Sequence, residues 1–239
     1  MSLDTDPPYK MGGVLVKRLA IKSATSAMWS VVGTFPVPID QTGSYAKIIL
    51  LFLSAIFAND SIDTVYVDKQ NSQVNWIGRK VTGEHSGYIN LSSGWIVLKN
   101  SIPITGSIII DMHSITTTDI ESPEWSLKLT NHLKNDDFFS VDSFPEASIK
   151  IHSAIKFNEK NKFEILAALT IRGITHDISF PIQLESKDNI MTATGSIDIN
   201  RTLFNIKYKS GKYFPDLGDR MIYDDFTILF KLKTITNKK

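Results

Sequence analysis

The 239-residue chain contains no cysteine. This absence excludes a disulfide framework, a thiolate zinc site, an iron–sulfur cluster and a cysteine nucleophile. It does not assign a compartment, because exported proteins also exist without disulfides. The compartment therefore has to be judged from other features of the sequence.

An excess of charge of one sign is also absent, since 26 Lys and Arg residues face 25 Asp and Glu residues and the formal net charge is +1. A nucleic-acid-binding protein needs basic residues in excess to neutralise phosphates. We therefore expect no nucleic-acid partner. The length and the 42% hydrophobic content are sufficient for a sizeable core in one or two domains.

Local motifs for catalysis or metal binding are missing. The chain has no Gly-x-Ser-x-Gly, no His-Glu-x-x-His and no phosphate loop. The acidic residues of 216–225 lack the alternation of a calcium loop and are interpreted as turn-forming. The chain has five histidines, and no two of them have the spacing of metal ligands. They are His85, His113, His132, His152 and His176. The sequence predicts no catalytic residue, no metal and no cofactor.

The longest apolar run is short. Lys47 precedes about eleven apolar or small residues, 48–58, and polar residues follow. A membrane span needs roughly 17–25 residues, so we expect no integral span; the segment 47–58 instead fits a secretory signal peptide. A buried core helix or strand is the alternative. Residues 1–46 show no sustained period and are either an unstructured extension or an artefact of the gene model.

From residue 62 the hydrophobic residues follow a period of two, which predicts short β-strands. Odd-numbered apolar residues continue through 149–171 on both sides of a polar hairpin loop at 158–161. Gly87 marks a bend or bulge, and residues 92–94 are expected to form a turn. The clearest strands are expected at 83–91, 95–99, 104–112, 149–157, 163–171, 178–184, 190–199 and 226–232.

One segment has helical signals. Ser122 is a capping residue, Pro123 suits the first turn, and Glu124 lies beside the positive end of the helix. Polar residues at 135–137 end the segment. One helix among about ten strands, without βαβ alternation, indicates an antiparallel sandwich or barrel. The sustained alternation favours a barrel.

The inward faces of this barrel are expected to be apolar. They would comprise the odd residues of 149–171 and the even residues of 178–184 and 226–232. A barrel of about eight strands can be filled by its side chains or can enclose one ligand. The alternation is compatible with either state.

Several blocks of sequence follow one another in a fixed order. They are Val74-Asn75-Trp76, residues 132–139 and 144–147, residues 169–176, residues 200–206, Leu217-Gly218-Asp219 and residues 222–226. With these blocks, the chain from about Val65 to Lys233 resembles the YceI-like family, lipocalin-like barrels that bind polyisoprenoids.

The resemblance implies a mainly β fold, an antiparallel lipocalin-like β-barrel with one short helix beside it, over residues 62–234. It implies export to the periplasm and a long hydrophobic tunnel for an amphiphilic lipid of isoprenoid, quinone or fatty amide type. Removing each methylene from water contributes about 0.8 kcal/mol. The family pattern also allows a homodimer.

Site residues follow from the matched blocks and from the inward faces. Lys80 stands where many members carry a histidine, and a cation there could meet a phosphate or carboxylate. The ligand-binding candidates are Trp76, Lys80, Phe138, Phe139, Ile151, Leu169, Phe180, Phe204 and Phe226.

The leading hypothesis is non-catalytic binding, transport or sequestration of such a lipid. One alternative is a lipid-modifying enzyme on the same barrel, with Lys80, His132 or the acids near Asp219 performing the chemistry. The other is a stress or adaptor module whose barrel is filled and whose functional surface lies outside.

Overall fold

The computed structural model describes residues 60–188 and 190–236. The segments 1–46 and 47–58, expected to be an extension or artefact and a signal peptide, lie outside these residues. Within the described residues, no helix has the length and apolar character needed to cross a bilayer.

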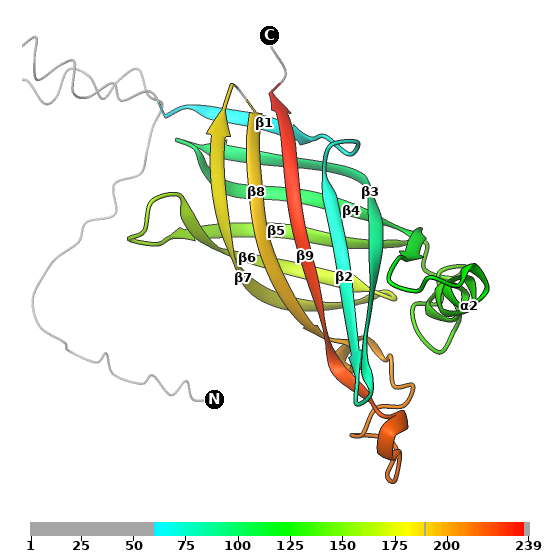
Figure 1. The fold of residues 1–239 in the computed structure, drawn as a ribbon. Helices are drawn as coiled ribbons and strands as arrows, with labels where there is room; N and C mark the ends of the chain where they lie inside the picture. Colours follow the sequence, from blue (N-terminus) through cyan, green and yellow to red (C-terminus); the bar gives the residue numbers. More distant parts are fainter. Residues whose placement is uncertain (1–59, 189, 237–239) are drawn as a thin grey trace, which may run out of the picture. The chain divides into compact units, whose positions relative to one another are not determined.

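The described chain consists of nine strands, one α-helix and two short 3₁₀ helices (Figure 1). The strands are β1 (Ile62–Val67), β2 (Gln73–Lys80), β3 (Gly83–Lys99), β4 (Ile102–Thr117), β5 (Glu146–Lys156), β6 (Lys162–Ile171), β7 (Ile174–Lys187), β8 (Ile190–Asn200) and β9 (Ile222–Thr236). The helices are α2 (Pro123–Lys134), η2 (Arg201–Phe204) and η3 (Gly218–Arg220).

All strand pairs are antiparallel, and the pairing of β3 with β4 closes the sheet into a barrel. The barrel has eight strand positions because β1 and β2 share one of them. Both lie between β3 and β9, where β1 pairs with residues 95–99 of β3 and β2 with residues 83–88. The predicted antiparallel barrel with one helix is confirmed.

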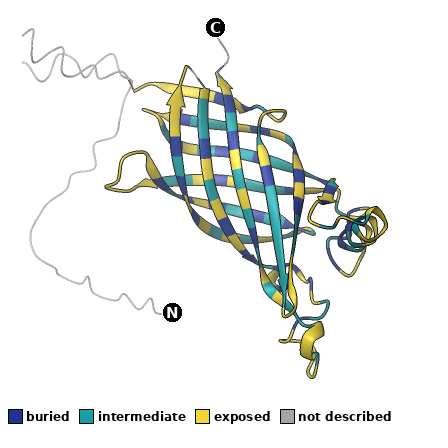
Figure 2. Cartoon of the chain, in the orientation of Figure 1, coloured by how far each residue is buried: buried dark blue, intermediate teal, exposed yellow. Residues whose placement is uncertain are grey.

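The alternation of inward and outward side chains follows the sequence pattern most strictly in β6. Its five odd-numbered residues from Phe163 to Ile171 are all 5% exposed or less. Figure 2 shows the same alternation of buried and more exposed positions along the neighbouring strands. Closed strands with one apolar face can bury that face only toward the barrel interior.

The inward face predicted for 149–157 is wrong beyond Ile151. The register of β5 against β6 shifts between Ile151 and Ser153. Ile155 and Phe157 are consequently 56% and 41% exposed. An extra residue in one strand turns all following side chains to the opposite face, because the side-chain period is two.

The turn predicted at 92–94 is also wrong. β3 continues through these residues, and its register against β4 shifts between Leu91 and Ser93. Gly94 serves close packing instead of a turn, since a Cβ at this position would lie 2.6 Å from the Val67 side chain. The glycine therefore allows β1 to pack against the bulged strand.

Helix α2 begins and ends where the sequence predicts. The Ser122 hydroxyl accepts a hydrogen bond from the Trp125 N–H, and Asn135 follows the last helical residue. The helix is held to the barrel by β4, because Thr130 Oγ1 donates to Thr117 Oγ1 at 3.0 Å and Ser126 Oγ donates to the Thr117 carbonyl at 3.0 Å.

Candidate ligand-binding cavity

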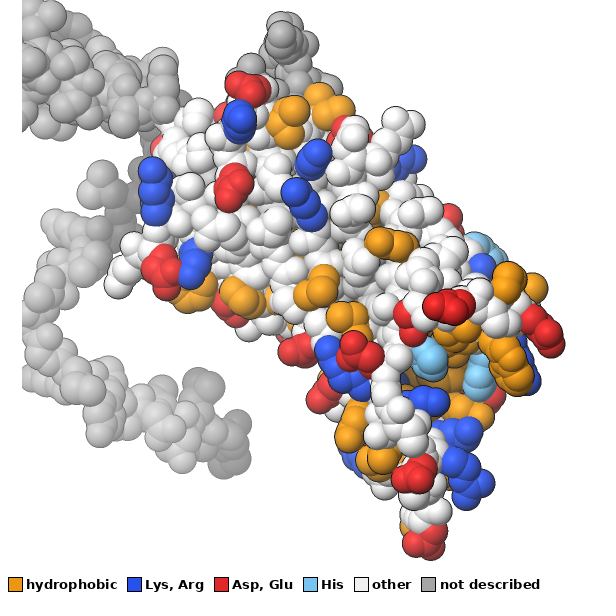
Figure 3. Space-filling view, viewed as in Figure 1, with side chains coloured by type: hydrophobic (Ala, Val, Ile, Leu, Met, Phe, Trp, Pro, Cys, Tyr) orange, Lys and Arg blue, Asp and Glu red, His pale blue; other side chains and the backbone are white. Residues whose placement is uncertain are grey.

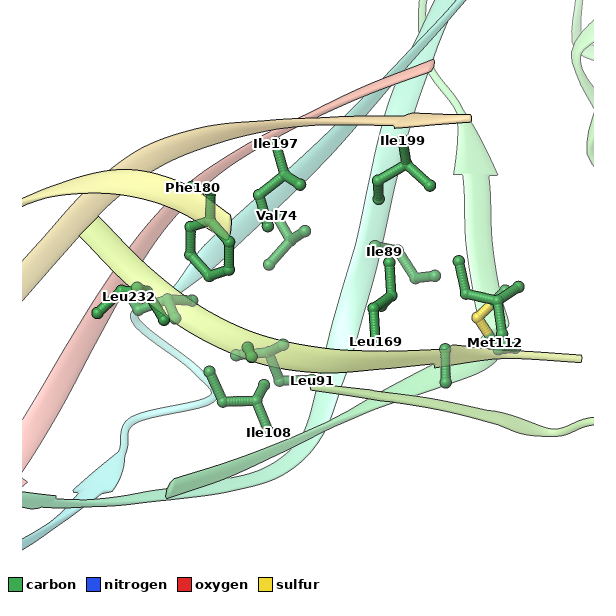
Figure 4. Packing of buried hydrophobic residues seen from close by; sticks show 14 of the residues in the cluster. Val74, Ile89, Leu91, Ile108, Met112, Leu169, Phe180, Ile197, Ile199 and Leu232 are labelled. Atoms are coloured by element: carbon green, nitrogen blue, oxygen red, sulfur yellow. The ribbon is translucent and has the colours of Figure 1, made fainter. Parts of the chain in front are cut away.

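A cavity runs along the interior of the barrel and is lined by residues of all nine strands and of α2. The centres of water-sized spheres can occupy about 200 Å³ of this interior. A hole that holds a single water offers only roughly 10–15 Å³ by the same measure. Figure 4 shows Val74, Ile89, Leu169, Phe180 and Ile197 projecting from different strands into this interior. The side chains of the barrel therefore do not fill it.

The wall of the cavity is apolar along most of its length. Apart from Gly78, the lining residues have wholly apolar side chains or the indole of Trp76, with five exceptions: Arg79, Arg201, Tyr223, Asp225 and Thr234. The first four gather at the end of the barrel that carries the connection from β8 to β9. The polar residues of the lining thus mark one end of the cavity, which we call its polar end, whereas the atoms that form the wall surface are apolar even there.

Trp76 forms a fixed part of the wall. Its indole Nε1 donates a hydrogen bond to the Thr116 carbonyl at 3.0 Å, reaching across β3 to β4. Gly87 makes this possible, because a Cβ there would lie 1.7 Å from the same carbonyl oxygen. A large aromatic ring is thereby immobilised with its polar atom satisfied.

A second glycine widens the middle of the cavity. The Phe230 ring lies directly against Gly195, where a Cβ would approach the ring to 2.5 Å. Phe230 also meets Phe180 edge to face, with ring centroids 6.0 Å apart. Because the ring can lie close to β8, it does not block the interior. The small side chains of Ala147 and Ala193 leave further space in the wall.

Aromatic residues that follow α2 contact the end of the cavity. Phe139 lies edge to face on Phe226 with ring centroids 6.1 Å apart. Phe138 packs against His132 and Tyr208, at centroid distances of 5.0 and 5.5 Å. The segment after the helix and the β8–β9 connection therefore meet at the same end of the barrel.

Arg201 fixes the β8–β9 connection. The residue is 4% exposed, and its guanidinium donates to the carbonyls of Ile206, Ile222 and Tyr223 at 3.0 Å each. Burial lowers the pKa of Arg201, and the nearby Asp224 carboxylate partly offsets this effect. Because its donors are engaged by the backbone, Arg201 serves the fold of this connection.

The ladder between β2 and β9 is interrupted at the polar end of the cavity. Gly78 pairs with Phe226 and Lys80 pairs with Ile222, so one residue of β2, Arg79, lies opposite three residues of β9. The uneven count bends β9 and breaks the regular pairing. Arg79 lines this end of the cavity and Lys80 does not, while the Arg79 guanidinium is directed to Thr227 and Glu84, which lie outside the cavity wall.

Arg79 keeps unused hydrogen-bonding capacity at this interruption. Its Nε lies 3.3 Å from Glu84 Oε2, and one terminal nitrogen donates to the Thr227 hydroxyl at 2.9 Å. A guanidinium has five N–H donors in total, so these two contacts do not use all of them. Asp225 also lines the cavity here.

Seven of the nine predicted site residues line the cavity: Trp76, Phe138, Phe139, Ile151, Leu169, Phe180 and Phe226. Lys80 and Phe204 are not among the lining residues. Phe204 is 1% exposed and packs edge to face on His176 at 5.3 Å, within the core of the β8–β9 connection. The sequence analysis missed Arg79, Tyr223 and Asp225, because no local pattern marks the register shift that brings these parts of β2 and β9 to the end of the cavity.

The groups considered for an enzymatic role lie outside the cavity wall. His132 Nε2 is 3.1 Å from Asp137 Oδ2, and neither it nor Lys80 nor Asp219 lines the cavity. Within residues 60–188 and 190–236, no group of three His, Asp or Glu side chains is placed to hold a metal ion.

The sequence model of the YceI-like domain matches residues 66–234, which begin in β1 and end in β9. The chain belongs to the YceI-like family. The barrel with its internal cavity is therefore the YceI-like domain of this protein. No curated protein matches the sequence.

Two solved structures share the fold of this YceI-like domain. Burkholderia cenocepacia BcnA is similar with a TM-score of 0.57 and 19% identity, over 70% of this chain and 98% of BcnA. A polyisoprenoid-binding domain from Saccharophagus degradans, implicated in plant cell wall breakdown, is similar with a TM-score of 0.53 and 11% identity, over 74% of this chain and 99% of that domain. At these identities the likeness concerns the fold alone.

Proposed function

We propose that this YceI-like protein binds a long-chain amphiphilic lipid of isoprenoid, quinone or fatty amide type and carries or sequesters it without chemical change. The observation that carries this proposal is the cavity, whose wall is apolar and whose few polar lining residues gather at one end. The similarity to a domain whose structure is described as polyisoprenoid-binding supports the same ligand class.

The apolar wall supports a long hydrocarbon tail as the buried part of the ligand. Each methylene removed from water contributes about 0.8 kcal/mol, although the affinity of a whole ligand stays well below the sum. No directional contact is needed along the tail, so one wall accepts saturated and isoprenoid chains. The polar head is placed in this proposal at the end with Arg79 and Asp225.

Native mass spectrometry of the full chain, purified without detergent, tests the proposal. We expect an added mass that leaves as a single lipid on activation. A ligand-free mass that stays unchanged after incubation with polyprenyl phosphates and with isoprenoid quinones would contradict it. Recovery of a chemically altered lipid would instead support a lipid-modifying enzyme.

We also propose that the protein acts in the periplasm, on the strength of the signal-like segment at 47–58. N-terminal sequencing of the protein recovered from its cells tests this. A start at Asn59 is expected, and an uncleaved N-terminus in a cytoplasmic fraction would contradict export.

A further inference from the structure

The connection from β8 to β9, residues 201–221, differs in charge from the rest of the described chain. It holds five Lys and Arg residues and two Asp residues, whereas the remaining described residues hold fourteen Lys and Arg against twenty Asp and Glu. The barrel is therefore acidic overall, with a basic segment at the polar end of its cavity. We call residues 201–221 the basic loop.

The basic side chains of this loop are accessible. Lys207, Lys212 and Arg220 are exposed and Lys209 is partly exposed. None of the ion pairs among the described residues uses any of these four. Their charge is thus available to an anionic partner and is not neutralised by neighbouring carboxylates.

Apolar side chains project from the same loop. Leu203, Tyr213 and Phe214 are 51%, 40% and 47% exposed. The ammonium groups of Lys207 and Lys212 lie 4.9 and 5.6 Å from the centre of the Tyr213 ring. Figure 3 shows basic and hydrophobic side chains near the end of the barrel that carries the loop and α2, with acidic side chains beside them. Exposed aromatics among lysines are typical of surfaces that bind the interface of a bilayer.

The loop is held in one shape by buried anchors. Ile206 and Ser210 are fully buried. The Ser210 carbonyl accepts hydrogen bonds from the N–H groups of Tyr213 and Phe214, and the Ile222 N–H donates to the Lys209 carbonyl at 3.0 Å. The exposed side chains are therefore presented on an ordered turn, which reduces the entropy lost on binding.

We propose that the basic loop docks this end of the barrel on an anionic lipid bilayer, so that the polar end of the cavity faces the membrane during lipid exchange. Acidic lipid headgroups would meet the lysines, while Tyr213 and Phe214 enter the interface. Each Lys or Arg near such a surface contributes about 1 kcal/mol, so three lysines correspond to roughly 100-fold in membrane affinity. The lipid-exchange role rests on the proposed function, but docking does not depend on whether the cavity binds lipid.

The absence of cysteine allows a site-resolved test on the full chain. A single cysteine is introduced by Pro215→Cys in the loop or by Asn158→Cys in the β5–β6 hairpin at the opposite end, and is labelled with an environment-sensitive fluorophore. Vesicles containing phosphatidylglycerol are compared with pure phosphatidylcholine vesicles. We expect a blue shift at residue 215 with the anionic vesicles only, and no shift at residue 158.

Two triple variants, each of which removes three positive charges, are compared in the same assay. Lys207→Gln/Lys209→Gln/Lys212→Gln is expected to remove most of the shift at residue 215. Lys156→Gln/Lys160→Gln/Lys187→Gln, at the opposite end, is expected to leave it unchanged. A similar shift at both labels, no shift at residue 215, or equal effects of the two triple variants would overturn the proposal. Retention of a co-purified lipid is measured separately, so failure of docking and failure of lipid binding are distinguishable.

Discussion

The indole of Trp76 lies against Gly87 so closely that a Cβ at Gly87 would be 2.9 Å from the indole nitrogen. Trp76 and Gly87 are also paired residues of β2 and β3. The ring crosses the glycine to reach the Thr116 carbonyl on β4. One cross-strand pair therefore joins three strands and positions a wall of the cavity.

Gly87→Ala is expected to destabilise the barrel. The added Cβ would collide with the Thr116 carbonyl and displace the indole, and such overpacking costs about 1–3 kcal/mol. Gly78→Ala is the matched control, because its Cβ would meet only the Trp76 ring at 3.8 Å. Urea unfolding followed by tryptophan fluorescence compares the two variants. Equal stability of the variants would contradict the proposed role of the Trp76–Gly87 contact.

Arg201→Lys is expected to lower the free energy of unfolding by about 2–4 kcal/mol. A lysine has one nitrogen and cannot reach the three carbonyls that the guanidinium fork contacts, and each buried carbonyl left unpaired costs about 1–3 kcal/mol. Chemical denaturation measures the loss. Arg220→Lys, at an exposed position of the same loop, should have little effect.

Ala193→Phe is expected to reduce lipid occupancy by adding a ring to the cavity wall. Ala193 is 8% exposed and lines the cavity, whereas the adjacent Thr194 faces outward. Thr194→Phe therefore adds the same ring outside the barrel. Native mass spectrometry should show less bound lipid for Ala193→Phe alone, with circular dichroism confirming that both variants fold. Equal occupancy would place the ligand elsewhere.

Arg79→Gln is expected to weaken binding of an anionic amphiphile about tenfold, since a charge-assisted hydrogen bond contributes about 1.5–3 kcal/mol. Binding of a neutral quinone should change little. Titrations followed by tryptophan fluorescence, to which Trp76 in the cavity wall contributes, measure both affinities. Lys231→Gln, outside the cavity on β9, is the control; a similar loss for the anionic and neutral ligands would argue against a headgroup contact.

The ionisation of Asp119 makes the stability of the barrel depend on pH. Burial raises its pKa, but hydrogen bonds from the Ser86 N–H and the His85 ring outweigh this effect, and the pKa lies below its ordinary value of 3.8. The folded state therefore binds this proton less readily than the unfolded state, so the stabilisation is present above about pH 4 and is lost as the pH falls through the lowered pKa.

Asp119→Ala should consequently destabilise the protein by about 1 kcal/mol near neutral pH. The difference in stability between this variant and the wild type should become smaller at acidic pH. Thermal unfolding across the pH range measures this, and the exposed Glu121→Ala provides the control. A difference that stays constant down to the most acidic condition would show that the Asp119 carboxylate is not the cause.

Local sequence signals determined the elements and most of their inward faces. A period of two predicts strands, and β6 follows it without interruption because no residue is inserted along its length. Ser122 and Pro123 predict the start of α2 because capping is a short-range interaction. The apolar interior and the absence of local catalytic motifs can also be read from the amino-acid sequence alone.

Only the tertiary structure decided the features that depend on register. The bulges in β3 and β5 change which face their residues point to. The interruption between β2 and β9 brings Arg79 and Asp225 to one end of the cavity and leaves Lys80 outside its lining. The basic loop acquired its position in the same way, because barrel closure places residue 201 at the end where α2 lies. Strand pairing joins residues far apart in sequence, so a shift of one residue leaves the local pattern unchanged while it redirects every side chain that follows.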